Sequence, residues 1–320
     1  MLLKYSLLVW LYVSVSIIKW SQSIEYPFPV KYLGLQIENE NVQMAYMDVR
    51  PSSSNGKAVI LFHGKNFNGF YWKDVITFLS QSGYRVIVPD QVGWGKSSKP
   101  DIHYSFYMLA KNNQVLLDSL GIKKVFVIGH SMGGMIATRF ALMFPDRVEK
   151  LVLENPIGLE DYRKIVPYKS LEELYGKEMN ATYESIKKYQ QSYYPVWKSD
   201  YEKYVAAQAE ALKDPEYKKI AWVNALTYEM IYEQPVCYEF ERINVPTLLI
   251  IGQSDRTVVG KDNLLKEKQG LYGDYPTLGK KTKSLIPNSR LIELTGIGHI
   301  PHVQDAELFQ KHLMEFLSQE

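Results

Sequence analysis

The hydrophobic residues of this chain form short continuous runs that alternate with amphipathic stretches. Residues 58–62, 85–89 and 124–128 are mostly apolar and β-branched, which is typical of strands that are covered on both faces. Near them, residues 72–82 and 107–120 place apolar side chains at helical spacing. Strands that alternate with helices predict β-α-β units and a parallel sheet.

A different pattern precedes the first of these runs. Residues 32–37 and 42–49 alternate between apolar and polar side chains, and the polar residues 38–41 separate them. This pattern predicts an antiparallel pair of strands joined by a turn. The other predicted elements are a helix at 131–144, strands at 150–153, 247–251 and 290–294, and a final amphipathic helix at 306–317.

The regular alternation stops in the middle of the chain. Residues 156–244 are polar, helical in spacing and dense in aromatic side chains, without a buried-strand pattern. The sequence therefore predicts one α/β core, formed by residues 24–155 and 245–320, that a helical insertion interrupts.

The N-terminus has the features of a targeting segment. An apolar stretch from residue 6 to 18 follows Lys4, and it is shorter than the roughly 20 residues that a membrane-spanning helix needs. Ser21 and Ser23 are small residues at the spacing of a cleavage site. We expect a signal peptide at residues 1–23, and hence a periplasmic or secreted protein with no stable membrane span after cleavage. An uncleaved N-terminal membrane anchor is the alternative.

Composition narrows the possible partners. The chain has 320 residues, 46% of them hydrophobic, and a formal charge of +2, which fits an ordinary globular protein. No basic patch with interleaved aromatic residues occurs, so we expect no nucleic-acid partner. Cys237 is the only cysteine, which excludes an internal disulfide and is more typical of a buried thiol than of a reactive one. We expect no metal and no cofactor, and the sequence leaves the oligomeric state open.

One serine stands where a strand is expected to give way to a helix. Residues 129–133 read Gly-His-Ser-Met-Gly and fit the pattern G-x-S-x-G in that setting. Such a turn lifts the Ser131 hydroxyl clear of the sheet and places the Met132 N–H at a helix start, where it can stabilise an oxyanion. Ser131 is therefore a candidate nucleophile, with a simple helix cap as the alternative. We expect a packing role for His130.

A nucleophilic serine needs a base and an acid that orients the base. His299 follows the strand at 290–294 in a glycine-flanked loop and is the candidate base, whereas His302 is the weaker one. Asp255 follows the strand at 247–251 and is the candidate acid, with Glu154 as the alternative acid.

The second oxyanion donor should come from the loop after the first buried strand. Gly64 permits a close approach of the backbone there, so the N–H of Lys65 is the candidate, with Asn66 behind it. We expect His63 to brace this loop.

Five motifs together carry a family resemblance. They are His63-Gly64, residues 90–97, residues 129–133, Asp255 and residues 298–301, and in this order they resemble the α/β-hydrolase fold superfamily. The resemblance implies a mostly parallel eight-stranded sheet with a helical cap inserted after the sixth strand, which would be residues 156–244. It also implies Ser131 as nucleophile, His299 as base and Asp255 as acid. Epoxide hydrolases and haloalkane dehalogenases carry an aspartate at the position of Ser131, which argues against both activities.

The insertion bears on the substrate. It contains thirteen tyrosines, and a cap lined by some of them would form a mostly apolar pocket with a few hydroxyl donors. We expect residues 226–232 to lie nearest that pocket, and we interpret residues 258–287 as an irregular segment between acid and base.

Three functions are compatible with these residues. The first is a serine hydrolase that cleaves a carboxylic ester, thioester or lactone of an apolar small molecule through an acyl-enzyme. The second is a C–C bond hydrolase of β-diketones or ring-fission products. The third is a ligand-binding protein of low turnover on the same fold.

Overall fold

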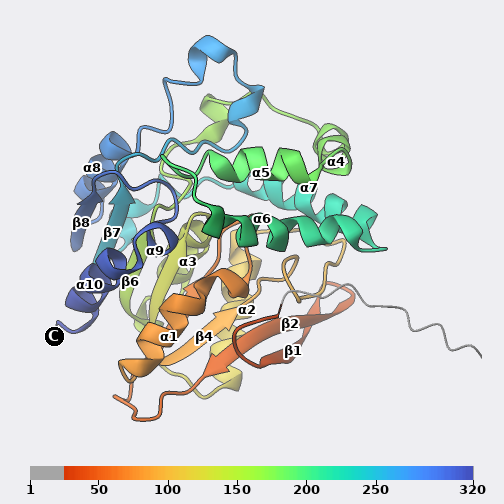
Figure 1. Ribbon diagram of the computed structural model, residues 1–320. Helices are drawn as coiled ribbons and strands as arrows, with labels where there is room; N and C mark the ends of the chain where they lie inside the picture. The colour runs from red at the N-terminus through yellow and green to blue at the C-terminus, as the bar shows by residue number, and fades with distance from the viewer. Residues whose placement is uncertain (1–24, 320) are drawn as a thin grey trace, which may run out of the picture.

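The computed structural model describes residues 25–319 and is built around one eight-stranded sheet (Figure 1). The strand order is β1-β2-β4-β3-β5-β6-β7-β8, and β2 runs antiparallel to both of its neighbours while the remaining pairs are parallel. The strands are β1 Val30–Ile37, β2 Glu40–Val49, β3 Ala58–Phe62, β4 Arg85–Pro89, β5 Val125–His130, β6 Val148–Glu154, β7 Thr247–Gly252 and β8 Ser289–Leu294. The mostly parallel eight-stranded sheet that the resemblance implied is confirmed. The signal peptide expected at residues 1–23 lies outside the described residues.

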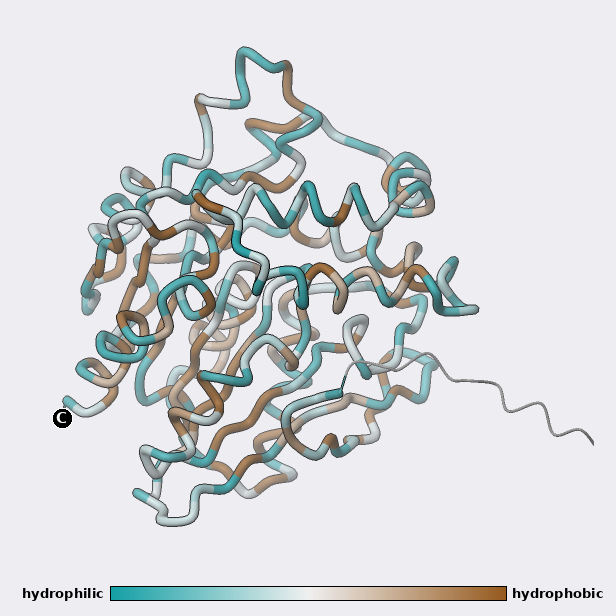
Figure 2. Tube along the Cα trace, in the orientation of Figure 1, coloured by the Kyte–Doolittle hydropathy of each residue, from teal (hydrophilic) through white to brown (hydrophobic). Residues whose placement is uncertain are grey.

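The continuous apolar runs form the centre of this sheet. Every residue of β3, β5 and β7 is buried, because helices cover both faces of these strands. In Figure 2 the central strands are brown while the turns at the surface are teal. The edge strand β1 instead alternates between exposed and partly buried positions, as expected of a strand with one solvated face.

Two helical layers enclose the sheet (Figure 1). Helices α1 Lys73–Gln81 and α10 Ala306–Leu317 pack on one face, where Val75, Ile76 and Leu79 of α1 are buried. Helices α2 Phe106–Ser119, α3 Met132–Met143 and α8 Tyr275–Leu285 cover the other face. The short helix α9, Pro301–Gln304, precedes α10. None of the helices in the described part of the chain is long and apolar enough to cross a membrane.

The segment between β6 and β7 forms a helical layer above the sheet in Figure 1. It contains α4 Leu171–Met179, α5 Tyr183–Gln191, α6 Glu202–Ala209 and α7 Tyr217–Glu233. Helix α4 packs against α7, and α5 packs against α6. These helices therefore form one layer that lies over the carboxyl ends of the strands.

Three sequence interpretations differ from the structure. The β1–β2 turn comprises only Glu38 and Asn39, because β2 begins at Glu40, two residues before the predicted strand, and Glu38 adopts a positive φ of 52°. Residues 258–287 are not irregular throughout, since α8 begins there with Pro276 near its N-terminus, where a proline is well tolerated. Cys237 is only partly buried, and burial raises the pKa of its thiol.

Candidate active site

Ser131 occupies the sharp turn between β5 and α3. Its φ of 56° and ψ of −121° are strained for a residue with a side chain, and such strain is typical of functional positions. The neighbouring glycines are required sterically. A Cβ on Gly129 would lie 2.2 Å from the Gly133 oxygen, and a Cβ on Gly133 would lie 2.0 Å from the Phe62 oxygen. Only residues without side chains allow this turn to form against β3.

The structure brings the three predicted site residues together. His299 lies in the loop after β8, and its Nε2 is 3.0 Å from Ser131 Oγ. Its Nδ1 is 2.7 Å from Oδ2 of Asp255, which lies in the loop after β7. His299 and Asp255 are almost wholly buried, at 0% and 2% exposure. Because parallel strands end at the same edge of the sheet, residues that are 168 and 44 positions apart form one hydrogen-bonded chain.

The carboxylate of Asp255 is held by more than His299. Its Oδ1 accepts a hydrogen bond of 2.8 Å from the Thr257 N–H, and its Oδ2 accepts one of 2.8 Å from the Asn155 side-chain amide. Burial alone would raise the pKa of Asp255, but the charge of His299 and these hydrogen bonds lower it below its ordinary value. The carboxylate is thus kept ionised beside the imidazole.

Asn155 is a site residue that the sequence interpretation missed. Its Oδ1 accepts the Gly252 N–H at 2.9 Å while its amide holds Asp255, so it joins the ends of β6 and β7. Its φ is 35°, a left-handed conformation that asparagine tolerates better than most residues. Its position directly after a buried strand is the sequence feature that could have identified Asn155 as a site residue.

Glu154 and His302 form a separate buried pair. Glu154 Oε1 accepts the His302 N–H at 2.8 Å and lies 2.9 Å from His302 Nδ1. The ring of His302 stacks on Trp72 at a centroid distance of 4.2 Å. In the described part of the chain, no hydrogen bond connects Glu154 with His299. The alternative acid Glu154 therefore contacts His302 and not the candidate base His299.

The loop after β3 lies against the serine. A Cβ on Gly64 would lie 3.0 Å from Ser131 Cβ, and Lys65 and Asn66 line the same cavity as Ser131. Among the described residues, no acceptor bonds to the backbone N–H of Lys65 or of Met132. Both amides are available to an oxygen bound near Ser131. His63 braces this loop as expected, because its Nε2 accepts the Gln91 N–H at 3.0 Å.

His130 has a more specific role than packing. Its Nε2 lies 2.8 Å from the carbonyl oxygen of His299, so Nε2 must carry the proton. Its Nδ1 then accepts from the Tyr71 hydroxyl at 3.0 Å, and that hydroxyl in turn accepts the Gly64 N–H at 3.0 Å. Burial, and after it the neighbouring His299, hold the pKa of His130 well below its ordinary value. A neutral His130 thus connects the loop of Gly64 with the backbone of His299.

A cavity of about 370 Å³ opens above Ser131. The helical insertion contributes much of its wall, including Tyr189, Tyr193 and Tyr228. Tyr228 belongs to the segment 226–232 that was expected near the pocket. The segment after Asp255 contributes Val259–Asp262.

Tyr193 is the insertion residue in closest contact with the site. Its ring stacks on His299 at 4.7 Å between centroids, and its carbonyl oxygen accepts the His299 N–H at 2.8 Å. Its hydroxyl accepts a hydrogen bond of 2.9 Å from Asn66. A Cβ on Gly298 would lie 2.1 Å from the Tyr193 oxygen, so this contact requires a glycine. Which of the thirteen tyrosines of the insertion packs on the histidine could not be predicted from the sequence.

Comparisons with known proteins agree with this architecture. Residues 57–170 match the model of the α/β hydrolase fold family. The crystal structure of a probable hydrolytic enzyme from Pseudomonas aeruginosa PAO1 is 44% identical with a TM-score of 0.90, covering 92% of this chain and 96% of that one. A 2-hydroxy-6-oxononadienedioate/2-hydroxy-6-oxononatrienedioate hydrolase from Burkholderia vietnamiensis is 26% identical over 302 residues, which are 90% of this chain and 95% of that protein.

A shorter match covers part of the chain only. An uncharacterised protein of Mycobacterium bovis is 38% identical over 107 residues, which are 33% of this chain and 31% of that protein. The chain thus spans about a third of the length of this relative.

Proposed function

This chain belongs to the α/β-hydrolase fold superfamily, and from that membership and the geometry around Ser131 we propose that it is a serine hydrolase acting on a carboxylic ester, thioester or lactone. The observation that carries the proposal is the hydrogen-bonded chain from Ser131 Oγ through the His299 ring to the Asp255 carboxylate. A hydroxyl is a weak nucleophile by itself, and this arrangement gives it a base within reach and an acid that orients the base.

The acylation step follows from the positions of these atoms. His299 Nε2 takes the proton of Ser131 Oγ as that oxygen attacks the substrate carbonyl. Asp255 keeps Nδ1 protonated and stabilises the imidazolium that forms. The protonated Nε2 then gives its proton to the leaving alcohol or thiol, and the acyl group stays on Ser131. Water, deprotonated by His299, releases the acid in the second half of the reaction.

The negative charge on the substrate oxygen needs donors that are already in place. We assign this role to the backbone N–H groups of Met132 and Lys65, which have no protein acceptor in the described part of the chain. The Met132 amide also stands at the start of α3, where the helix dipole favours negative charge. Each such donor contributes about 3 kcal/mol to transition-state stabilisation.

The residues that line the cavity favour a mostly apolar substrate. Ile157, Ile186 and Val259 line it together with the tyrosines, and residues 156–244 cover it from the insertion side. We propose that this insertion acts as a cap that excludes water from the acyl-enzyme.

The test of this function is covalent labelling combined with turnover. A fluorophosphonate probe is expected to label the wild-type protein once, at Ser131, and a panel of p-nitrophenyl acyl esters is expected to be hydrolysed. Ser131→Ala should lose both labelling and turnover while keeping the thermal unfolding midpoint of the wild type. Folded wild-type protein that neither reacts with the probe nor hydrolyses any ester would contradict the proposal.

One comparison favours a second candidate. The Burkholderia vietnamiensis relative is named as a hydrolase of 2-hydroxy-6-oxo dienedioates, and it matches over 90% of this chain. A C–C bond hydrolase would use the same Ser131 and His299. Turnover of vinylogous β-diketones at rates that exceed those for every p-nitrophenyl ester would select this candidate.

A further inference from the structure

Of the three described lysines that line the candidate catalytic cavity, two contact other groups of the protein. On its outer side, Lys177 forms an ion pair of 3.8 Å with Asp262. Lys261 donates a hydrogen bond of 2.9 Å to the carbonyl oxygen of Arg256. These two lysines thus have partners within the protein.

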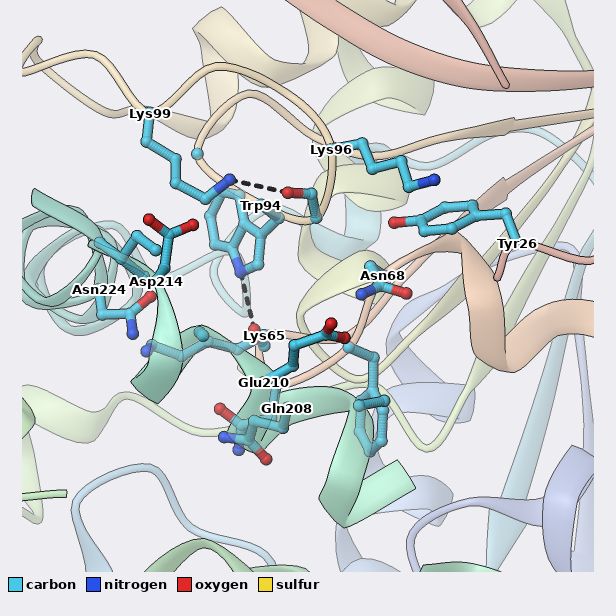
Figure 3. Close-up of a pocket in the computed structure, with 17 residues that line it drawn as sticks. Tyr26, Lys65, Asn68, Trp94, Lys96, Lys99, Gln208, Glu210, Asp214 and Asn224 are labelled. Carbon is cyan, nitrogen blue, oxygen red and sulfur yellow. Dashed lines mark hydrogen bonds between the residues drawn. The ribbon is translucent and has the colours of Figure 1, made fainter. Parts of the chain in front are cut away.

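Lys65 and Asn66 also line an adjoining cavity of about 350 Å³. Two other lysines of that cavity likewise contact groups of the protein. Lys99 donates to the carbonyl oxygens of Gly95 and Ser97, and the first of these bonds is drawn in Figure 3. Lys96 places its ammonium group over the ring of Tyr26 at 4.5 Å from the ring centroid.

Lys65 lines both cavities and differs from these lysines. Figure 3 shows its side chain extending from the loop toward Asn224 of α7, while its carbonyl oxygen accepts the Trp94 indole N–H at 2.7 Å. Within residues 25–319, no hydrogen bond or ion pair joins its Nζ to an acceptor. The acid whose charge acts on it is Glu178, whose Oε2 accepts a hydrogen bond of 3.0 Å from Asn224.

An ammonium group without a partner is costly where water is partly excluded. Burial lowers the pKa of Lys65, whereas the charge of Glu178 acts in the opposite direction. The three N–H donors of Lys65 are therefore available to an acceptor that enters the cavity from outside the protein. A carboxylate supplies the missing counter-charge and accepts a charge-assisted hydrogen bond.

We propose that the Lys65 ammonium group binds a carboxylate on the substrate, so that the preferred substrates are esters that carry a free carboxylate close to the scissile carbonyl. The inference rests on the proposed function, because it places the substrate carboxylate relative to the Ser131 hydroxyl and the Lys65 N–H. Since the same residue supplies the oxyanion donor, its four-carbon side chain sets the separation between the reacting carbonyl and the anionic group. The apolar part of the substrate then packs against Ile157, Ile186 and Val259.

The charges around the cavity favour a carboxylate over a phosphate. One lysine matches the single charge of a carboxylate, while Glu178 and Asp262 on the same cavity wall oppose the second charge of a phosphate monoester. Bidentate recognition of phosphate is a property of arginine, and none lines this cavity in the described chain.

The test compares matched esters on matched variants. The substrates are p-nitrophenyl monoesters of the four- to eight-carbon dicarboxylic acids, each beside its methyl-capped diester, with spontaneous hydrolysis subtracted. The variants are Lys65→Met, which removes the ammonium group at similar length, and Lys177→Met, which removes a paired lysine from the same cavity. The readout is the ratio of kcat/KM for the free acid to that for the capped ester, because any disturbance of the oxyanion donor affects both esters alike.

Wild-type protein should prefer the free acid, and Lys65→Met should lower the ratio about 10-fold or more, chiefly through KM. Lys65→Arg should restore part of the preference, and Lys177→Met should leave the ratio near that of the wild type. Absence of a preference in the wild type, or an equal loss of the ratio in Lys177→Met, would overturn the proposal.

A binding measurement separates this inference from the proposed function. Ser131→Ala should bind monomethyl adipate more tightly than dimethyl adipate in calorimetry, and the added substitution Lys65→Met should remove that difference. If the wild type fails to hydrolyse esters but this difference is present, the proposed reaction is wrong and the carboxylate site stands. If esters are hydrolysed and the difference is absent, the carboxylate site is wrong and the hydrolase stands.

Discussion

Two buried histidine–carboxylate pairs lie side by side beneath the insertion, and they differ in what the second ring nitrogen meets. In both pairs Nδ1 contacts a carboxylate, at 2.7 Å for His299–Asp255 and 2.9 Å for His302–Glu154. Nε2 of His299 faces the Ser131 hydroxyl, whereas Nε2 of His302 is buried with no partner in the described structure. A carboxylate beside a buried imidazole is thus not enough for catalysis, because the base must also reach a nucleophile and a cavity.

The largest expected effect comes from replacing His299 by glutamine, and the same substitution of His302 is the comparison. His299→Gln should lower kcat for a p-nitrophenyl ester by about 10⁶-fold, since it removes the imidazole that contacts Ser131 Oγ. His302→Gln should lower the thermal unfolding midpoint but change kcat far less, because its ring packs on Trp72 away from the serine. Steady-state kinetics and thermal unfolding of both variants measure the difference. Equal losses of kcat would remove the distinction between the pairs.

The carboxylates should show the same contrast at a smaller scale. Asp255→Asn is expected to reduce kcat about 10⁴-fold, because an amide at this position favours the wrong tautomer of His299. Glu154→Gln should act on stability instead, since it disturbs the buried hydrogen bonds between Glu154 and His302, and leaving a buried polar group without a partner costs about 1–3 kcal/mol. Urea unfolding and single-turnover kinetics report the two effects separately. A collapse of kcat in folded Glu154→Gln protein would show that the second pair takes part in the reaction.

The smallest expected effect concerns His130, whose ring lies between the two pairs at 5.0 Å from His299 and 5.5 Å from His302. Its pKa is lowered in the folded state, so below about pH 6.5 the unfolded chain binds a proton that the folded protein does not. Stability from this residue is therefore present above that pH and is lost as the pH falls.

Urea unfolding at pH 7 and pH 5 measures this dependence. Wild-type protein should lose more unfolding free energy on acidification than His130→Gln does. The buried His63, whose pKa is also lowered, is present in both proteins and cancels in the comparison. Equal losses in the two proteins would mean that His130 does not titrate as its surroundings indicate.

Part of the fold and of the site was accessible from the sequence because it rests on local rules. The central strands were recognisable as continuous apolar runs, and the turn at Ser131 requires glycines at fixed positions whatever surrounds it. His299 and Asp255 were candidates because each follows a strand whose carboxyl end faces the same edge of the sheet. The helix α8 was missed because its glycine, threonine and lysines obscure its apolar face in the sequence.

The choice between candidates needed the tertiary structure, because it depends on distances between segments that are remote in the chain. Glu154 ends β6 and Asp255 lies in the loop after the neighbouring strand β7, and only the folded arrangement decides which of them meets His299. The contact of Tyr193 with His299 joins the insertion to the loop after β8. Only the folded structure likewise shows that the Lys65 ammonium group lines the cavity without a hydrogen-bond partner among the described residues. The sequence determined which residues are able to do chemistry, and the packing of the sheet and the insertion decided which of them meet.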